Sequence, residues 1–281
     1  MATAKRILFI TQEITPYVSE SDISIVGRYL PQAVQESKRE IRTFMPKWGH
    51  INERRNQLHE VIRLSGMNLI IDDTDHPLII KVASIQSARM QVYFIDNDDF
   101  FQNRLMLTDA NGVEYTDNDA RVIFYARGVL ETVKKLRWCP EVIHCHGWIS
   151  ALAPLYIKRA YKDEPSFRNT KVVFSLYDEE FKTPFNENFA SKLLLKGVYK
   201  KDLASLKSPL TYETVMKLAI DFSDGIIIQG QHVNENLIQY AKDNGKLILP
   251  YQEKEVLYEA CNNFYDTVLS QEEENDNNTA K

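Results

Sequence analysis

Short apolar runs alternate along this chain with longer segments in which apolar residues recur at the three-to-four residue spacing of a helix. The runs are rich in Ile, Val, Leu and Phe, as in parallel strands that are buried on both faces. They predict strands at residues 6–11, 42–45, 142–145, 171–176 and 225–228. The periodic segments predict helices at residues 24–37, 119–136, 149–160, 190–206, 211–221, 233–243 and 253–269.

Residues 52–96 have a different pattern. Segments 60–71, 77–85 and 90–95 are strand-like, and the turn cluster Asp72–His76 separates the first two. We expect antiparallel strands here, added to the parallel sheet. The predicted fold is therefore α/β, with a Rossmann-like, mostly parallel sheet, flanking helices and an added antiparallel strand region. One domain is expected over residues 1–270, followed by a disordered acidic tail over 271–281.

Composition limits the kinds of partner that the protein is expected to bind and the cellular compartment in which it is expected to lie. The 281 residues carry a formal net charge of −5 without a basic stripe, so nucleic acid is not an expected partner. Cys139, Cys145 and Cys261 have neither disulfide nor metal spacing, which fits a reducing cytoplasm. The apolar run near the N-terminus is too short for a signal peptide or a membrane span. We therefore expect a cytoplasmic protein that does not bind a membrane.

The candidate chemistry begins at the end of the strand 142–145. His144 and His146 are two positions apart and can point to the same side of that strand, and Gly147 and Trp148 follow in a tight turn. Ligands of open α/β sheets collect beyond such carboxyl ends. On bare sequence the two histidines are either ligand-binding residues or hydrogen-bonded core residues, and Trp148 favours packing over stacking on a ligand.

Phosphate-binding glycine loops are absent where they would be expected. No glycine occurs between Thr11 and Ile25, so neither a dinucleotide fingerprint nor a P-loop follows the first strand. No third ligand stands close to the two histidines to complete a metal site. We therefore expect no cofactor and no bound metal. Tyr177 and Asp178 end another strand, and the acidic pair Glu179-Glu180 after them reads either as acid–base groups or as a solvated loop.

Several of these segments, taken together, resemble one family. Its first strand is followed by S-E-x-x-P, and its later motifs include Y-x-D-N-x-x-R, H-x-H-D-W and L-A-P-x-Y. The matching segments in this chain are Arg6–Pro16, Tyr29–Pro31, Tyr115–Arg121, His144–Trp148, Leu152–Tyr156, Lys171–Tyr177 and Phe222–Ile228. In order and spacing the chain is similar, from about residue 5 to 245, to the N-terminal catalytic domain of bacterial glycogen synthases and plant starch synthases.

The resemblance implies a fold, a reaction and a set of binding residues. Such enzymes have two Rossmann-like domains, the GT-B arrangement, and transfer glucose from a nucleotide-glucose to an α-1,4-glucan. An α-glucan or a nucleotide-sugar is thus the implied ligand. The implied candidates for substrate binding are His144, His146, Trp148, Tyr177 and Asp178.

The chain also departs from the family pattern. Where the family carries K-x-G-G near the donor, Ser19, Ser21 and Asp22 replace the lysine and the two glycines, and Gly147 replaces the aspartate of H-x-H-D-W. A cationic contact to the diphosphate is lost and negative charge is added, which opposes a diphosphate.

Residues after 250 leave room for one helix and a tail. We therefore expect a glycosyltransferase domain that does not catalyse alone and works with a protein partner that supplies a C-terminal domain. The alternatives are a scaffold or regulatory protein that binds a glucan or a protein in the same cleft, and an enzyme with a changed donor that uses Tyr177, Asp178 and Glu179.

Overall fold

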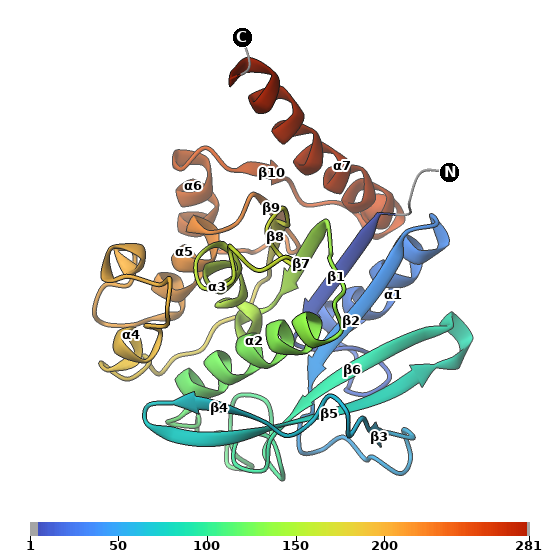
Figure 1. Cartoon of the computed structure of the whole chain (residues 1–281), viewed down its shortest axis with the longest axis vertical. Coiled ribbons are helices and arrows are strands. Elements are labelled where there is room, and N and C mark those ends of the chain that lie inside the picture. The colour runs from blue at the N-terminus through green and yellow to red at the C-terminus, as the bar shows by residue number, and fades with distance from the viewer. Residues whose placement is uncertain (1–4, 280–281) are drawn as a thin grey trace.

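A sheet of ten strands runs through the centre of the protein (Figure 1). The computed structural model describes residues 5–279, with side chains to residue 271. Seven strands are parallel, in the order β10–β9–β8–β7–β1–β2–β6. Their bounds are Arg6–Thr11 (β1), Glu40–Pro46 (β2), Met90–Asp96 (β6), Val142–His146 (β7), Lys171–Leu176 (β8), Gly225–Ile228 (β9) and Leu247–Leu249 (β10). The predicted mostly parallel α/β sheet is confirmed.

The antiparallel extension is built on β5 (Thr74–Ile85), which pairs with β6. Both β3 (His59–Glu60) and β4 (Met67–Ile71) pair with β5 in antiparallel register. The predicted continuous strand over 60–71 is wrong, because a turn closed by the hydrogen bond from Leu64 N to Val61 O (2.8 Å) separates β3 from β4.

Helices cover both faces of the sheet. Successive β1 residues point to opposite faces, as the pleat requires. Ile7 and Phe9 pack under α1 (Asp22–Glu36) and α7 (Lys254–Thr279). Leu8 and Ile10 belong to the larger core on the opposite face. The helices that contribute to this core include α2 (Asn118–Lys135), α3 (Ala153–Lys158), α5 (Tyr212–Asp221) and α6 (Glu235–Asp243). The result is a three-layer α/β/α sandwich.

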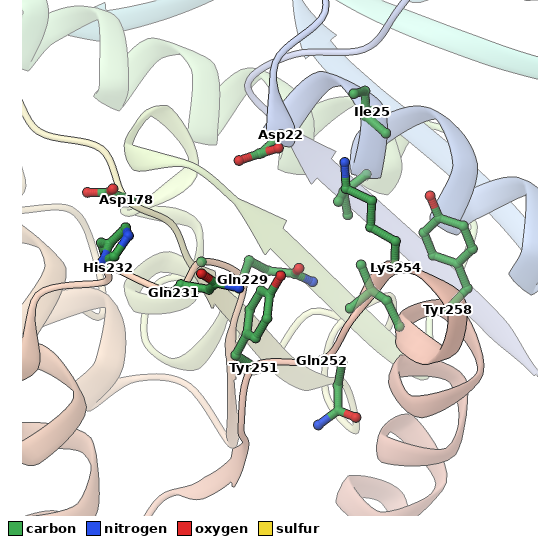
Figure 2. A pocket seen from close by; sticks show the side chains of 13 residues that line it. Asp22, Ile25, Asp178, Gln229, Gln231, His232, Tyr251, Gln252, Lys254 and Tyr258 are labelled. Atoms are coloured by element: carbon green, nitrogen blue, oxygen red, sulfur yellow. The ribbon is translucent and has the colours of Figure 1, made fainter.

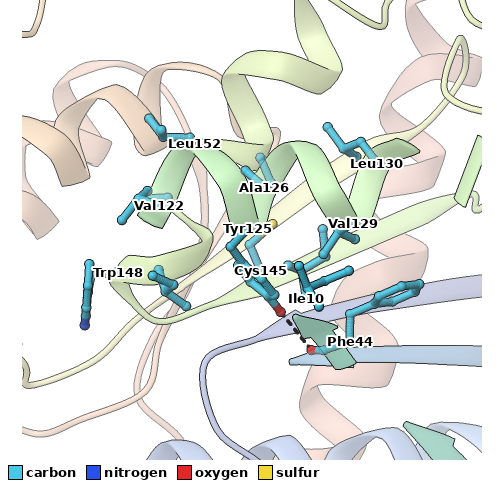
Figure 3. Packing of buried hydrophobic residues seen from close by; sticks show 14 of the residues in the cluster. Ile10, Phe44, Val122, Tyr125, Ala126, Val129, Leu130, Cys145, Trp148 and Leu152 are labelled. Carbon is cyan, nitrogen blue, oxygen red and sulfur yellow. Dashed lines mark hydrogen bonds between the residues drawn. The ribbon is translucent and has the colours of Figure 1, made fainter. Parts of the chain in front are cut away.

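Tyr125 shows how tightly α2 is seated on the sheet (Figure 3). Its ring lies in the core beside Ile10 and Cys145 and is fully buried. Its hydroxyl is 2.8 Å from Thr11 O and 3.0 Å from Phe44 O, which are carbonyls of two neighbouring strands. Because the hydroxyl has a partner, the polar end of the ring is accommodated in an apolar core.

The bounds of three predicted helices differ from those in the structure. The predicted helix 190–206 is wrong: the chain forms α4 (Phe189–Lys192) and a separate 3-10 turn, Lys200–Leu203, because Gly197 at φ 96° interrupts the helix. The helix predicted over 149–160 is shorter and begins with a 3-10 turn, Trp148–Ser150, before α3. Helix α7 runs to Thr279, past the predicted end at 269. Residues 271–279 of the predicted disordered tail lie in this helix, and residues 280–281 lie outside the described residues.

In the part of the chain that the structure describes, no helix has the length and apolar character needed to cross a lipid bilayer. The three cysteines are free, with Cys145 and Cys261 buried and Cys139 exposed.

Arg121 organises the long connection between β6 and α2. The residue is fully buried. Its guanidinium donates hydrogen bonds of 2.6–2.9 Å to Phe100 O, Leu105 O, Met106 O and Asn118 Oδ1. A planar group with five donors is needed to hold several carbonyls at once. The arginine of the Y-x-D-N-x-x-R motif is therefore a structural residue in this chain.

We expect Arg121→Lys to lower the free energy of unfolding by at least about 2 kcal/mol, because an ammonium group leaves buried carbonyls without donors. Urea denaturation followed by circular dichroism measures the loss. Arg168→Lys, at an exposed position, is the matched control and should change the free energy by less than about 0.5 kcal/mol. Equal unfolding midpoints for Arg121→Lys and the unaltered protein would contradict the structural role.

Candidate functional site

The order of the parallel strands puts a topological switch point between β1 and β7, since β2 lies on one side of β1 and β7–β10 lie on the other. Loops that leave the carboxyl ends of adjacent strands meet there. They bring together residues 12 and 13 after β1, Trp148 after β7, 177–180 after β8, and 229 and 230 after β9.

These residues line a cavity of about 320 Å³, together with the N-terminal turn of α1 and two residues of the loop before α2. Its walls carry five carboxyl groups, which belong to Glu13, Asp22, Asp178, Glu179 and Glu180. Among the described residues that line it there is no lysine or arginine. The cavity is therefore acidic, which suits donors such as sugar hydroxyls and opposes a diphosphate.

Two neighbouring cavities, each of about 330 Å³, share Asp178 with the first. Figure 2 shows one of them: Asp22 of α1 and Asp178 border the same space as Gln229 and Tyr251. Lys254 at the start of α7 extends toward the N-terminal turns of α1. Asp178, which the sequence predicted as a site residue, is thus the exposed junction of all three cavities.

Gln12 joins two carboxyl groups of the acidic cavity. Its amide nitrogen donates to Glu13 Oε1 at 3.0 Å and to Glu179 Oε2 at 3.2 Å. The backbone N–H of Trp148 donates to the other oxygen of Glu179 at 2.8 Å. Burial raises the pKa of Glu179 to about 8 although both hydrogen bonds act in the opposite direction. At neutral pH Glu179 is therefore mostly the neutral acid.

Gly147 lies directly under the Gln12 side chain. Its φ is 79°, and a Cβ at this position would stand 2.6 Å from Gln12 Oε1 and 2.9 Å from Gln12 Cβ. Gln12 occupies the first position of the S-E-x-x-P pattern, where the family has serine. The larger residue at 12 and the missing side chain at 147 are therefore complementary in space.

The two histidines turn out to be core residues. His144 is fully buried, with Nδ1 2.7 Å from Tyr265 Oη on α7 and Nε2 2.7 Å from Ser175 Oγ on β8. His146 is also fully buried, and its Nδ1 lies 2.8 Å from Tyr177 Oη. Burial lowers the pKa of His146 to about 3 and that of His144 well below its usual value, so both rings are neutral at physiological pH.

Neither histidine lines the three cavities. His146 acts on the site by holding Tyr177, which lines two of them. Trp148 borders the acidic cavity but is 3% exposed, and its ring makes edge contacts with Phe181 and Phe185. Packing accounts for most of its surface.

The loop before α1 is rigid at the positions that depart from the family pattern. Ser21 caps the helix and forms a reciprocal pair with Ser24, with N–H to Oγ distances of 3.0 and 2.8 Å. The Ser21 hydroxyl also donates to Glu13 Oε2 at 2.5 Å. Ser19 contributes a carbonyl that accepts from Ser24 Oγ (3.1 Å), so this loop presents side chains and acidic charge to the cavity.

Sequence reasoning did not single out Gln12 or Glu13, and it weighed Glu179 mainly as a solvated residue. One signal was available for Gln12 and Glu13, because both lie in the segment Arg6–Pro16 that carries the resemblance. In the described part of the chain, no group of three His, Cys, Asp or Glu side chains is arranged to hold a metal ion.

A solved structure shares this architecture. The catalytic domain of Starch Synthase IV from Arabidopsis thaliana, bound to ADP and acarbose, superposes with a TM-score of 0.69. The match covers 89% of this chain and 52% of that one, at 16% sequence identity. The shared architecture defines the fold class: a Rossmann-like α/β domain, with a mostly parallel sheet like that of the starch synthase domain.

Sequence comparison identifies the family within that class. The family model for the starch synthase catalytic domain matches residues 6–246, and the chain belongs to this family. The glycogen synthases of Pelodictyon phaeoclathratiforme and Chlorobium limicola are each 36% identical to it over 174 residues. These matches cover 62% of this chain and 36% of each relative, so the chain spans little more than a third of the curated relatives it matches.

We expect Gly147→Asp to destabilise the protein, because an L-residue at φ 79° and ψ 163° is strained by about 1–3 kcal/mol and its Cβ also collides with Gln12. Gln12→Ser in the same chain should remove the contact with Oε1, which is the shortest, and leave both the strain and the contact with the Cβ of residue 12. The double variant should therefore be more stable than Gly147→Asp alone. A double-mutant cycle of urea unfolding measures the coupling, and additive effects of the two changes would contradict the proposed fit.

A second prediction concerns pH. The folded protein keeps a proton on Glu179 up to about pH 8, whereas an unfolded glutamate releases it near its usual pKa of about 4.3. Stability contributed by this group is therefore complete below about pH 4 and is lost as the pH rises toward 8. Glu179→Gln, which does not titrate, should lose less stability than the unaltered protein between about pH 5 and about pH 9. Parallel urea midpoints across this range would refute the shift.

Proposed function

We propose that this glycosyltransferase domain binds an α-1,4-glucan in the acidic cavity and does not hold the diphosphate of a nucleotide-sugar with its own residues. The observation that carries the proposal is the lining of that cavity, which has five carboxyl groups and, among its described residues, no lysine or arginine. Carboxylates accept hydrogen bonds from sugar hydroxyls and repel phosphates.

Family membership supports the choice of ligand. The matched relatives are named glycogen synthases, and the structural neighbour was solved with ADP and acarbose. In this chain the K-x-G-G positions carry Ser19, Ser21 and Asp22, and Ser21 is already engaged by Glu13. A nucleotide site would then have to be supplied by residues outside this domain, such as those of a protein partner. Glucosyl transfer would occur only with that partner present, in the cytoplasm.

A scaffold or regulatory role is the alternative. The carboxyl groups of Asp178 and Glu180 are exposed at the cavity mouth, where they would accept a basic segment of a protein as readily as a sugar. Glucan binding is preferred because the cavity lies at the switch point of the sheet, where small ligands of α/β proteins bind.

Calorimetric titration with a maltooligosaccharide tests the proposal. We expect measurable heat at millimolar ligand, and Asp178→Ala should weaken binding about tenfold, because a hydrogen bond to a charged group is worth roughly 1.5–3 kcal/mol. Asp98→Ala removes an exposed carboxylate that lines none of the cavities around Asp178 and is the matched control. The proposal fails if no heat is detected, or if both variants bind alike.

Incubation of the same protein with ADP-[14C]glucose or UDP-[14C]glucose and glycogen addresses the donor. No glucan labelling is expected from the domain alone. Labelling that disappears in His146→Ala, in which the support of Tyr177 is lost, would show that the domain does hold a nucleotide-sugar.

A further inference from the structure

A separate cavity of about 450 Å³ lies at the opposite edge of the sheet, where the parallel strands begin. It is bordered by the first residues of β2, by the connection between β5 and β6, and by the last turns of α1. Its polar walls include two arginines, Arg42 and Arg89, and three glutamines, Gln35, Gln86 and Gln91. It shares no residue with the cavities around Asp178.

Arg42 has no hydrogen-bonded acidic partner, although the Glu40 carboxylate is close enough to interact with it electrostatically. Its Nη1 donates to Tyr93 Oη at 2.5 Å, and its guanidinium carbon lies 5.6 Å from the ring centre of Tyr93 and 5.2 Å from that of Trp138. Its Nε is buried without a hydrogen-bond partner. No ion pair joins Arg42 to a described carboxylate. This half-buried guanidinium therefore has a carboxylate in its surroundings but no hydrogen bond to it.

Glu40 is the acidic residue of this cavity, and it is already engaged. Its Oε2 accepts from Arg6 Nε at 3.0 Å, and its Oε1 accepts from Trp138 Nε1 at 2.6 Å. Both Arg6 and Arg42 interact electrostatically with this carboxylate. The charged residues of the cavity walls are Arg42, Arg89 and Glu40, so the formal charge of the walls is positive.

Arg89 is an unusual residue at its position. It follows the 3-10 turn Gln86–Ala88 with φ 51° and ψ 36°, in the left-handed region that favours glycine or asparagine. Its side chain is exposed and makes no hydrogen bond or ion pair with the described residues. Arginine is strained in this backbone conformation, and its unpaired guanidinium borders a cavity. Strained residues often lie at functional sites, which suggests that this guanidinium has a function.

We propose that this cavity binds an oxyanion, a phosphate or carboxylate group of a small molecule, between Arg42 and Arg89. The planar guanidinium groups offer paired N–H donors that match the oxygens of such anions. The amides of Gln86 and Gln91 lie within the same walls and add neutral donors. The site is independent of glucan binding, because it lies at the other edge of the sheet.

Titration of the full chain with inorganic phosphate, at constant ionic strength kept by chloride, tests the site. Binding is expected at millimolar phosphate by calorimetry. Arg89→Asn should weaken it about tenfold, because a charge-assisted hydrogen bond is lost. The same variant should unfold at the same or a higher temperature than the unaltered protein, since asparagine tolerates the left-handed conformation. A loss of affinity in that variant therefore cannot be attributed to unfolding.

Arg89→Lys keeps the charge and the strained backbone, removes the fork of donors, and should bind with intermediate affinity. Arg55→Asn, at an exposed arginine outside this cavity, is the control and should bind phosphate like the unaltered protein. Glycerol 3-phosphate and citrate, titrated in the same way, separate phosphate esters from carboxylates as the preferred source of the anion. Absence of binding by all three anions, or equal losses in Arg89→Asn and Arg55→Asn, would overturn the proposal.

Discussion

The parallel pairing of β1 with β7 is the constraint on which the site depends. The pairing continues one residue past the ladder, where Gln12 N donates to His146 O at 3.2 Å. This bond fixes the backbone of Gln12, and the side chain then lies over the Cα of Gly147. From there its amide reaches both Glu13 and Glu179. A backbone register set by strand pairing thus determines which carboxyl groups meet at the switch point.

In the cavity that results, burial disfavours the charged form of the carboxyl groups that line it. Carboxyl groups in one small space repel each other when ionised, and withdrawing them from water adds to the cost. The protein relieves the repulsion in two ways. Glu13 receives hydrogen bonds from Gln12 and Ser21, and the pKa of Glu179 rises so that this group is mostly neutral at pH 7. The remaining charge lies on exposed carboxylates such as Asp178 at the cavity mouth. Such a surface attracts donors and cations, and a diphosphate would have to approach against it.

The fold was largely predictable from the sequence, whereas the site was predictable only in part. The segment 90–95 was expected among the antiparallel strands, yet β6 also pairs in parallel with β2. Buried parallel strands are continuous apolar runs, so β1, β2, β7, β8 and β9 could be recognised. The split of 60–71 and the break at Gly197 could not, because turn geometry outweighed apolar spacing there. The resemblance located Asp178 and Tyr177 at the right edge of the sheet. It also placed the two histidines at this edge. It did not predict that they are buried, because that depends on Tyr265, which α7 contributes from the far end of the chain.

The two edges of the sheet differ in charge because the segments that follow the strands carry acidic residues, whereas those at the start of the strands carry arginines. At the carboxyl ends, the loops after β1 and β8 contribute glutamate and aspartate. At the amino ends, β2 and the connection into β6 contribute Arg42 and Arg89, and Glu40 there is neutralised by Arg6. Because the length of the strands separates these edges from each other, each edge can bind a ligand of its own charge preference. An anion at the amino edge would therefore not compete with a sugar at the carboxyl edge, although the two ends of the α1 helix border the two cavities.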